Sequence, residues 1–260
     1  LFQSKSKLVT CIEIMLQPKE SRKAQQLLTN TSKKVNKKYW PSLKGSITTD
    51  EMRLIFIAKC QDFNIIPTPK LFERFLNHQS KKPFIKVFDM ARCALGKGSA
   101  AILANILITK PLLKIVDISG NSIGDQGAFC FSKLISSSRN IISMNLSSNS
   151  ITDEGSQLIF AEMTNNKHII SLNLGSDNGV GRNSIGAKSA QAIKVMLQSN
   201  NILSELDISM TEITCDMVTP ISQGIRQNSA LQYFNISNNN IQSKGVNILL
   251  KACAKSKIQV

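Results

Sequence analysis

The glycine-rich stretch "NLGSDNGVGRNSIGAKSA", residues 173–190, is the first candidate for a chemical site in this sequence. A dinucleotide-binding turn needs G-x-G-x-x-G between a strand and a helix, because its glycines let the backbone approach a pyrophosphate at the helix N-terminus. Here the glycines read G-V-G-R-N-S-I-G, which is two residues too long. The stretch "LGKGSA" at 95–100 lacks the G-x-x-x-x-G-K frame of a phosphate-binding loop. Neither motif alone shows whether it binds a phosphate, so its role must be inferred from the elements around it.

Other residues that could do chemistry are scattered. His78 and His168 are the two histidines and lie in different segments, which argues against a metal site or a catalytic triad. The six cysteines form no C-x-x-C pair, and this predicts a reducing compartment without a disulfide or zinc framework. Asp153 and Glu154 are adjacent, so on a helix they do not face each other, and a place at a helix N-terminus explains them. We therefore expect no catalytic residue, no metal and no cofactor.

An internal repeat gives the chain its organisation. The segments "LKIVDISGNSI" (113–123), "IISMNLSSNSI" (141–151) and "LQYFNISNNNI" (231–241) share one pattern of apolar and polar positions. Copies of this pattern start at residues 85, 113, 141, 169, 203 and 231, in steps of 28, 28, 28, 34 and 28. The single long step places six extra residues between Leu174 and Asn183. The glycine-rich stretch is therefore interpreted as an insertion in the loop that leaves a strand, not as a nucleotide site.

Each position of the repeat has a physical reading. The first, fourth and sixth residues, such as Leu113, Val116 and Ile118, are expected to point inward from a short strand. The ninth residue is mostly asparagine, whose amide can satisfy backbone groups of neighbouring coils and form a ladder. This predicted ladder comprises Cys93, Asn121, Asn149, Asn183, Thr211 and Asn239. Gly124-Asp125, Thr152 to Glu154 and Thr214 are expected to begin helices, so each unit is strand, turn, helix.

With these residues, and above all "IISMNLSSNSITDEG" (141–155), the sequence resembles leucine-rich repeat proteins of the ribonuclease-inhibitor type. The resemblance covers residues 84–260 and implies an α/β fold: a curved solenoid of about six 28-residue strand-turn-helix units with the parallel sheet on its concave face. It brings no catalytic residues, since most members bind proteins, and a non-enzymatic role is expected. The concave-face positions that we expect to contact a partner are Lys86, Arg92, Lys114, Asp117, Asn145, Asn173, Asp207 and Tyr233.

The N-terminal third lacks the repeat. Residues 48–63 and 69–78 read as helices, and the segment 48–83 is expected to cap the apolar end of the first coil. Residues 1–47 form a basic arm, in which four lysines precede two aromatic residues: Lys33, Lys34, Lys37, Lys38, Tyr39 and Trp40. Two interpretations stay open, a contact with an acidic protein surface or nucleic acid, and a solvated linker.

The charge indicates the class of partner. The formal net charge is +15, and residues 1–83, with 16 Lys/Arg against 6 Asp/Glu, supply +10 of it. We expect a protein partner in a multi-subunit cytoplasmic complex, with tubulin or axonemal subunits suggested by the similar layout of leucine-rich repeat subunits in the nexin–dynein regulatory complex of cilia. RNA or ribosome association is the alternative, and a GTPase-activating role for Arg92 fits less well. No membrane or small-molecule partner is expected, because no apolar run approaches the roughly 18 residues of a membrane span. No polar capping helix is evident near Val260, so an uncovered apolar end there would call for a further repeat or a neighbour.

Overall fold

The computed structural model describes residues 47–79, 86–177 and 181–254. Within them strands and helices alternate along the chain after two initial helices. The elements are α4 (Thr49–Asp62), α5 (Pro69–Gln79), β1 (Val87–Asp89), α6 (Lys97–Ile108), β2 (Ile115–Asp117), α7 (Gly124–Ser137), β3 (Ser143–Asn145), α8 (Asp153–Met163), β4 (Ser171–Asn173), α9 (Ala187–Ser199), β5 (Glu205–Asp207), α10 (Cys215–Gln227), β6 (Tyr233–Asn235) and α11 (Gln242–Cys253). Each strand and the helix that follows it form one coil, and we number the coils one to six from β1 to β6.

The six strands form one parallel sheet in sequence order, β1 to β6. Residues 28 apart pair between neighbouring strands, as Val116 pairs with Met144. Across the long step the partners are 34 apart, as for Leu172 and Leu206, and the register is kept. The six extra residues therefore lie outside the sheet, as the repeat spacing predicts.

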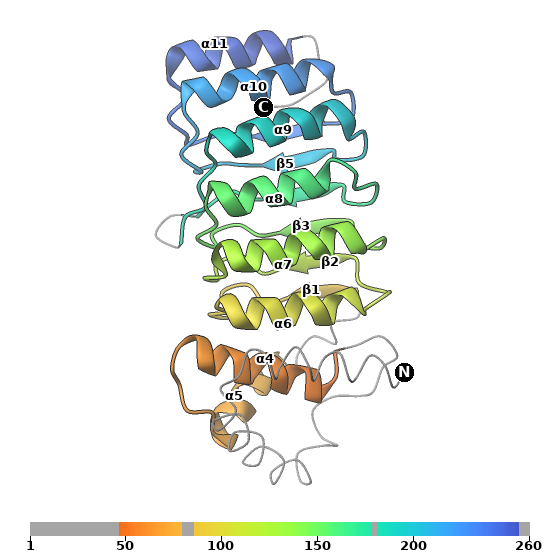
Figure 1. Ribbon diagram of the computed structural model, residues 1–260, viewed down its shortest axis with the longest axis vertical. Helices are drawn as coiled ribbons and strands as arrows, with labels where there is room; N and C mark the ends of the chain where they lie inside the picture. The colour runs from red at the N-terminus through yellow and green to blue at the C-terminus, as the bar shows by residue number, and fades with distance from the viewer. Residues whose placement is uncertain (1–46, 80–85, 178–180, 255–260) are drawn as a thin grey trace.

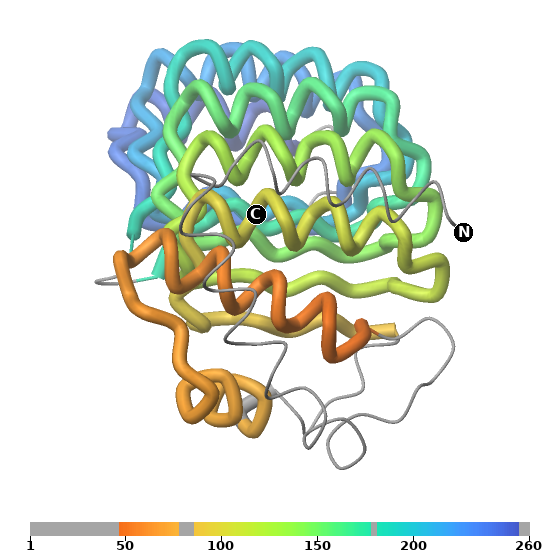
Figure 2. The backbone as a smooth tube through the Cα atoms, turned by 60° about the horizontal axis from the view of Figure 1, so that its bottom comes forward, coloured from red at the N-terminus to blue at the C-terminus, as the bar shows by residue number. Residues whose placement is uncertain are grey.

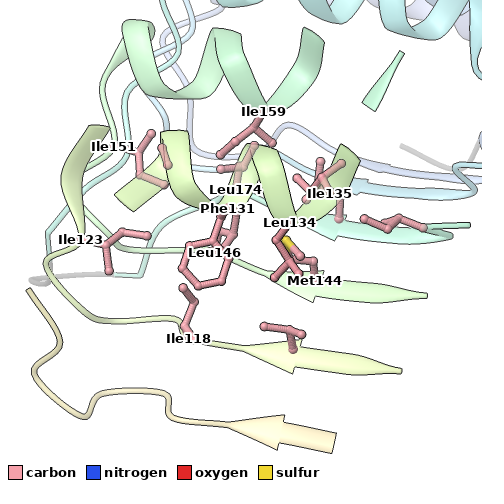
Figure 3. Close-up of a cluster of buried hydrophobic side chains, with 14 of the residues drawn as sticks. Ile118, Ile123, Phe131, Leu134, Ile135, Met144, Leu146, Ile151, Ile159 and Leu174 are labelled. Atoms are coloured by element: carbon pink, nitrogen blue, oxygen red, sulfur yellow. The ribbon is translucent and has the colours of Figure 1, made fainter. Parts of the chain in front are cut away.

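The helices of the coils all lie on one face of the sheet, and successive helices pack side by side (Figure 1). Figure 2 looks along the array and shows the same two layers, helices on one side and strands on the other. Between the layers lies a continuous apolar core, to which the first, fourth and sixth repeat positions contribute, so Leu113, Val116 and Ile118 are at most 1% exposed. Figure 3 shows how the strand residue Met144 and the helix residues Phe131 and Leu134 meet in this core.

The helix α4 is fixed to both ends of α6. At its start Thr48 forms a capping box with Glu51. Glu51 also pairs with Lys110, just beyond the end of α6, at 2.7 Å. At the other end of α4 the carboxylate of Asp62 accepts hydrogen bonds from the amides of Gly98 and Ser99 in the first turn of α6. The two helices expected at 48–63 and 69–78 are thus present as α4 and α5, and α4 covers the N-terminal side of coil one.

Candidate interaction surface

Both glycine-rich candidates for phosphate binding are helix starts already occupied by a carboxylate. A phosphate at a helix N-terminus needs free backbone amides. At α9 the amides of Gly186, Lys188 and Ser189 donate to Asp153, on the preceding coil. At α6 the amides of Gly98 and Ser99 donate to Asp62, and the amide of Gly96 donates to the hydroxyl of Ser99. The glycines of these stretches therefore belong to helix starts and loops. The carboxylate of Asp153 or Asp62 takes the place that a phosphate would occupy.

Hydrogen bonding sets the state of Asp153. Its partial burial alone would raise the pKa of the carboxyl group, but the bonds from Ser189, Lys188 and Gly186 outweigh burial and hold the pKa below its usual value. The predicted place of Asp153 at a helix N-terminus is correct, and the structure adds that it also caps the helix of the next coil. Asp125 repeats this arrangement one coil earlier, where it accepts from the amides of Thr152 and Gly155.

The remaining chemical groups are dispersed. His168 lies in the loop before β4 and its backbone amide donates to Asn166, whereas His78 belongs to α5. Burial raises the pKa of the Cys60, Cys130 and Cys253 thiols, so these groups stay protonated at neutral pH. In the described part of the chain no cluster of three or more His, Cys, Asp or Glu side chains is arranged to hold a metal ion. No helix of this part is long and apolar enough to cross a bilayer.

The face of the sheet opposite the helices carries a polar row across all six strands. The row consists of the last residue of each strand, Asp89, Asp117, Asn145, Asn173, Asp207 and Asn235. Each of these side chains accepts a hydrogen bond from the amide two residues further on, as Asp117 does from Ser119 at 2.9 Å. Bonds also cross between strands, from Asn145 to Asp117 at 3.1 Å and from Asn235 to Asp207 at 2.8 Å. The row thus fixes the loops that leave the strands and presents a polar strip beside them.

The eight sequence-predicted contact residues occupy three places. Asp117, Asn145, Asn173 and Asp207 belong to the polar row. Lys86 and Lys114 are exposed directly before β1 and β2, and Tyr233 begins β6 with its side chain 47% exposed. Arg92 lies apart from these residues, in the loop after β1. The lysines and aromatic residues of the basic arm lie outside the described residues.

Beside the lysines, the sheet face bears an aliphatic band that the sequence analysis missed. The band consists of Val87 and Ile115, which pair in β1 and β2, and of Ile142 and Ile170, which directly precede β3 and β4; the four residues are 37–44% exposed. The sequence contains an indication of this band, because these β-branched residues occupy the second or third repeat position, which the core does not require to be apolar. Exposed apolar residues that adjoin one another on a soluble protein mark interaction surfaces, unlike single scattered ones.

The inserted loop lies along the edge where the strands end and links distant coils. Asp177 in this loop pairs with Arg92 of coil one at 3.0 Å, and its amide donates to the hydroxyl of Ser148 in coil three at 2.7 Å. At the far end of the loop Arg182 lies 3.7 Å from Glu212 of coil five. Gly120 has a positive φ of 64°, and a side chain there would collide with Arg92 on its way to Asp177. The insertion therefore ties together the coils that it crosses.

Two ladders of asparagine side chains align the coils. The exit ladder, where strands end, comprises Asn121, Asn149, Asn183 and Asn239, and its Nδ2 atoms donate to carbonyls of their own coil and the preceding one. Cys93 and Thr211 stand at the same position without an amide, and Thr211 donates its hydroxyl to Ile208 at 2.7 Å. The entry ladder, where strands begin, comprises Asn166, Asn200 and Asn228 and has no counterpart in the sequence analysis. The sequence nevertheless indicates it, because these three asparagines are separated by the same 34- and 28-residue steps as the repeats.

Comparison with protein-family models agrees with this architecture. A family model described as "Leucine Rich repeat" matches residues 109–132, 137–160 and 227–247, which fall in coils two, three and six. The fold is a leucine-rich repeat solenoid. Among solved structures, "Leiomodin-1 Actin-Binding Site 2 (ABS2)" is similar with 18% sequence identity and a TM-score of 0.47, over 62% of this chain and 91% of that one. A comparison with curated protein sequences gave no match. Leucine-rich repeats are in general a protein-binding, non-enzymatic architecture, and the expected fold class is confirmed.

Proposed function

We propose that this leucine-rich repeat chain is a scaffold that binds an acidic protein partner through the sheet face of coils one to four. The observation that carries the proposal is the aliphatic band, whose exposed residues Val87, Ile115, Ile142 and Ile170 lie in or directly before the strands β1 to β4. Lys86 and Lys114 rim this band, and neither makes an ion pair with a described carboxylate. An apolar centre with a charged rim is the usual composition of a protein interface, and the lysines select for acidic residues on the partner.

The charge of the whole chain supports a partner of the cytoskeleton. Most of the net charge of +15 lies in the N-terminal third, and this charge adds long-range attraction to an acidic polymer. The acidic surface of tubulin meets this requirement, and the proposed setting is a multi-subunit assembly in the cytoplasm or the ciliary axoneme. A GTPase-activating role has less support, because the guanidinium of Arg92 is engaged by Asp177.

Co-sedimentation with microtubules tests the proposal, with RNA filter binding and polyglutamate competition as parallel arms. We expect microtubule binding that falls about thirtyfold when Ile115→Ser and Ile142→Ser are combined, because each substitution removes roughly 1 kcal/mol of apolar burial. The matched control is Val195→Ser on the helix side, where the side chain is 50% exposed. Replacement of Lys33, Lys34, Lys37 and Lys38 by Ser should weaken binding mainly at low salt.

The outcomes separate the alternatives. Equal binding of the double variant and the Val195→Ser control would remove the sheet face from the interface. Selective, lysine-dependent binding of RNA would replace the cytoskeletal partner by a nucleic acid. Full displacement of the chain by polyglutamate would reduce the interaction to non-specific charge attraction.

A further inference from the structure

One exposed cation accompanies each residue of the aliphatic band, on the side where the strands begin. Lys86 and Lys114 directly precede the band residues of β1 and β2. Before β3 and β4 the cation lies three residues ahead of the band residue, in the loop that enters the strand. We call these four cations the entry strip: Lys86, Lys114, Arg139 and Lys167. Within the described ranges none of them forms an ion pair with a carboxylate.

The two cations of the entry loops occupy the same place in the same turn. Arg139 and Lys167 follow Ser138 and Asn166, whose side-chain oxygens accept hydrogen bonds from the amides two and three residues further on. Each cation therefore lies inside a turn that hydrogen bonds close across it. The backbone that carries these cations is thus fixed, and only their exposed side chains are free to adapt to a partner.

The side where the strands end has the opposite character. Its arginines are already engaged, Arg92 by Asp177 at 3.0 Å and Arg182 by Glu212 at 3.7 Å. This side also bears the carboxylates of the polar row, among them Asp117. A partner that presents carboxylates to these coils is therefore attracted to the entry strip and repelled by the polar row, because like charges that face each other across an interface are unfavourable.

The spacing of the coils limits the backbone conformation of such a partner. The amide of Ile142 donates to the carbonyl of Lys114, and that of Ile170 to the carbonyl of Ile142, both at 2.8 Å, so the coils stack directly on one another here. Strands stacked in this way repeat every ~4.8 Å. An α-helix presents the same face again after each turn of ~5.4 Å, whereas an extended chain does so after every second residue, ~6.6 Å.

The difference accumulates along the band. Across coils one to four a helix runs about 2 Å ahead of the coils, which long Lys and Arg side chains can absorb. An extended chain runs about 5 Å ahead, which is a whole coil. The band also crosses the strands obliquely, since Ile115 pairs with Ser143 and not with Ile142, and this lengthens each step towards the helical pitch. A helix therefore matches the coils better than an extended segment does.

We propose that the acidic partner binds as an amphipathic α-helix that lies across coils one to four. The helix carries one Asp or Glu per turn along the entry strip and one aliphatic residue per turn on the band. This assignment rests on the proposed function; it adds Arg139 and Lys167 to the interface and specifies the secondary structure that the partner presents. Residues 1–46 of the chain do not have the composition that this helix needs, because they contain 10 Lys/Arg against 2 Asp/Glu.

The probe is a fluorescein-labelled, alanine-based peptide of about 16 residues, which as a helix is long enough to span the four coils. Glu occupies positions i, i+4, i+7 and i+11, and Leu follows each Glu, so that the acidic and the aliphatic stripe adjoin on the helix. In one control peptide two central alanines are replaced by Pro, which breaks the helix at the same charge. A second control peptide has the same composition with its Glu residues distributed around the helix. Fluorescence anisotropy measures binding to the full chain, and circular dichroism of the mixture measures helix formation.

We expect saturable binding of the helical peptide with a gain of helical circular dichroism, and at least tenfold weaker binding of both control peptides. The chain with Arg139→Glu and Lys167→Glu should also bind at least tenfold more weakly, because its new carboxylates oppose those of the peptide. Both side chains are exposed, so this variant is expected to fold. The matched control, Lys244→Glu with Lys251→Glu, makes the same change of charge at exposed positions of coil six and should bind normally.

Several results would overturn the proposal. These are no binding of the helical peptide, equal binding of the peptide that contains Pro, or equal binding by the Arg139→Glu/Lys167→Glu variant and its control. Tighter binding of a single-stranded RNA of equal charge, lost in the same variant, would replace the helix by a nucleic acid.

Co-sedimentation with microtubules separates this inference from the proposed function. Microtubule binding that depends on Ile115 and Ile142, without binding of the helical peptide, would overturn the helix and leave the proposed function standing. Binding of the helical peptide without microtubule binding would support the helix and remove the cytoskeletal partner.

Discussion

Asparagine side chains connect the coils at both ends of the strands, but they do so with different hydrogen bonds. On the exit ladder Asn183 accepts hydrogen bonds from the amides of Asn149 and Ile151 in the preceding coil, both at 3.0 Å. On the entry ladder Asn200 accepts from Ile202 and Leu203 of the following segment at 2.8 and 2.9 Å, and it donates back to Met163 and Asn166. The exit asparagines Asn121, Asn183 and Asn239 therefore complete the loop of the coil before them, whereas entry asparagines shape their own loop and fasten it to the coil before.

This difference has an energetic consequence. Loss of Asn121 or Asn183 leaves buried amides of another coil without acceptors, and a buried unsatisfied group costs about 1–3 kcal/mol. Loss of an entry asparagine frees amides in a loop beside the solvent, where the amide of Ile202 is partly exposed and water can replace the oxygen. Loss of an exit asparagine should therefore destabilise the fold more than loss of an entry asparagine.

The largest effect is expected for Asn183→Ala, because this side chain is 1% exposed and bonds to the backbone of both coil three and its own coil four. We expect the free energy of unfolding to fall by about 3 kcal/mol, measured by urea denaturation followed by circular dichroism. Asn149→Ala is the matched control within the same ladder. The Oδ1 atom of Asn149 has no hydrogen-bond partner among the described residues, so its loss should cost about 1–2 kcal/mol less. Equal losses would show that the accepted bonds contribute nothing.

On the entry ladder, Asn200→Ala should lower the free energy of unfolding by about 2 kcal/mol. The side chain is buried and joins Met163 and Asn166 to the loop before β5. Asn200→Asp separates its two functions, because it keeps the accepting oxygen and loses the donating amide. Thermal unfolding of both variants measures the share of each function, and a loss larger than that of Asn183→Ala would reverse the proposed order of the two edges.

The sequence predicts the exit asparagines but not the entry asparagines, because only the former interrupt an apolar pattern. The exit asparagines stand between the fixed apolar residues of the repeat, such as Ile118 and Ile123 around Asn121, and the alignment isolates them. The entry asparagines lie in polar runs such as "TNNKH" (164–168), where neighbouring residues are chemically alike. Pairings across coils, such as Arg92 with Asp177, depend on how the insertion folds back along the edge, and no local pattern encodes that. The aliphatic band was missed for a related reason, since apolar residues were assigned to the core.

Asp153 forms a third connection between coils, at the helix starts. Unlike the asparagines it titrates, so its contribution to the free energy of unfolding depends on pH. Asp153→Ala should lower the free energy of unfolding by about 1 kcal/mol at neutral pH, since three amides of the next coil lose their acceptor. The pKa of this carboxyl is depressed in the folded chain, so its contribution is present above the pKa of the unfolded state and is lost as the pH falls through the folded value. Wild type and variant should therefore converge in acid, as measured by urea denaturation between neutral pH and pH values below the ordinary range of aspartate. A difference that stays constant with pH would assign the loss to packing. Asn200→Ala is the control, since the asparagine side chain does not titrate in this range.

The smallest expected effect is a gain, at the one place where the entry ladder is incomplete. Ser138 stands 28 residues before Asn166, and its hydroxyl accepts from the amides of Asn140 and Ile141 at 3.4 Å, longer than the 2.8–2.9 Å bonds of Asn166. Its backbone, with φ −84° and ψ 132°, matches that of Asn200 and Asn228, and the side chain is only partly buried, which leaves room for a longer one. Ser138→Asn should therefore shorten these bonds, add a donor toward coil one and raise the free energy of unfolding by about 0.5 kcal/mol. The melting temperature measures this gain, and Ser137→Asn, one residue earlier on the exposed end of α7, is the matched control. If both substitutions had the same effect, the entry ladder would be a by-product of helix ends and would not act as a device that aligns the coils.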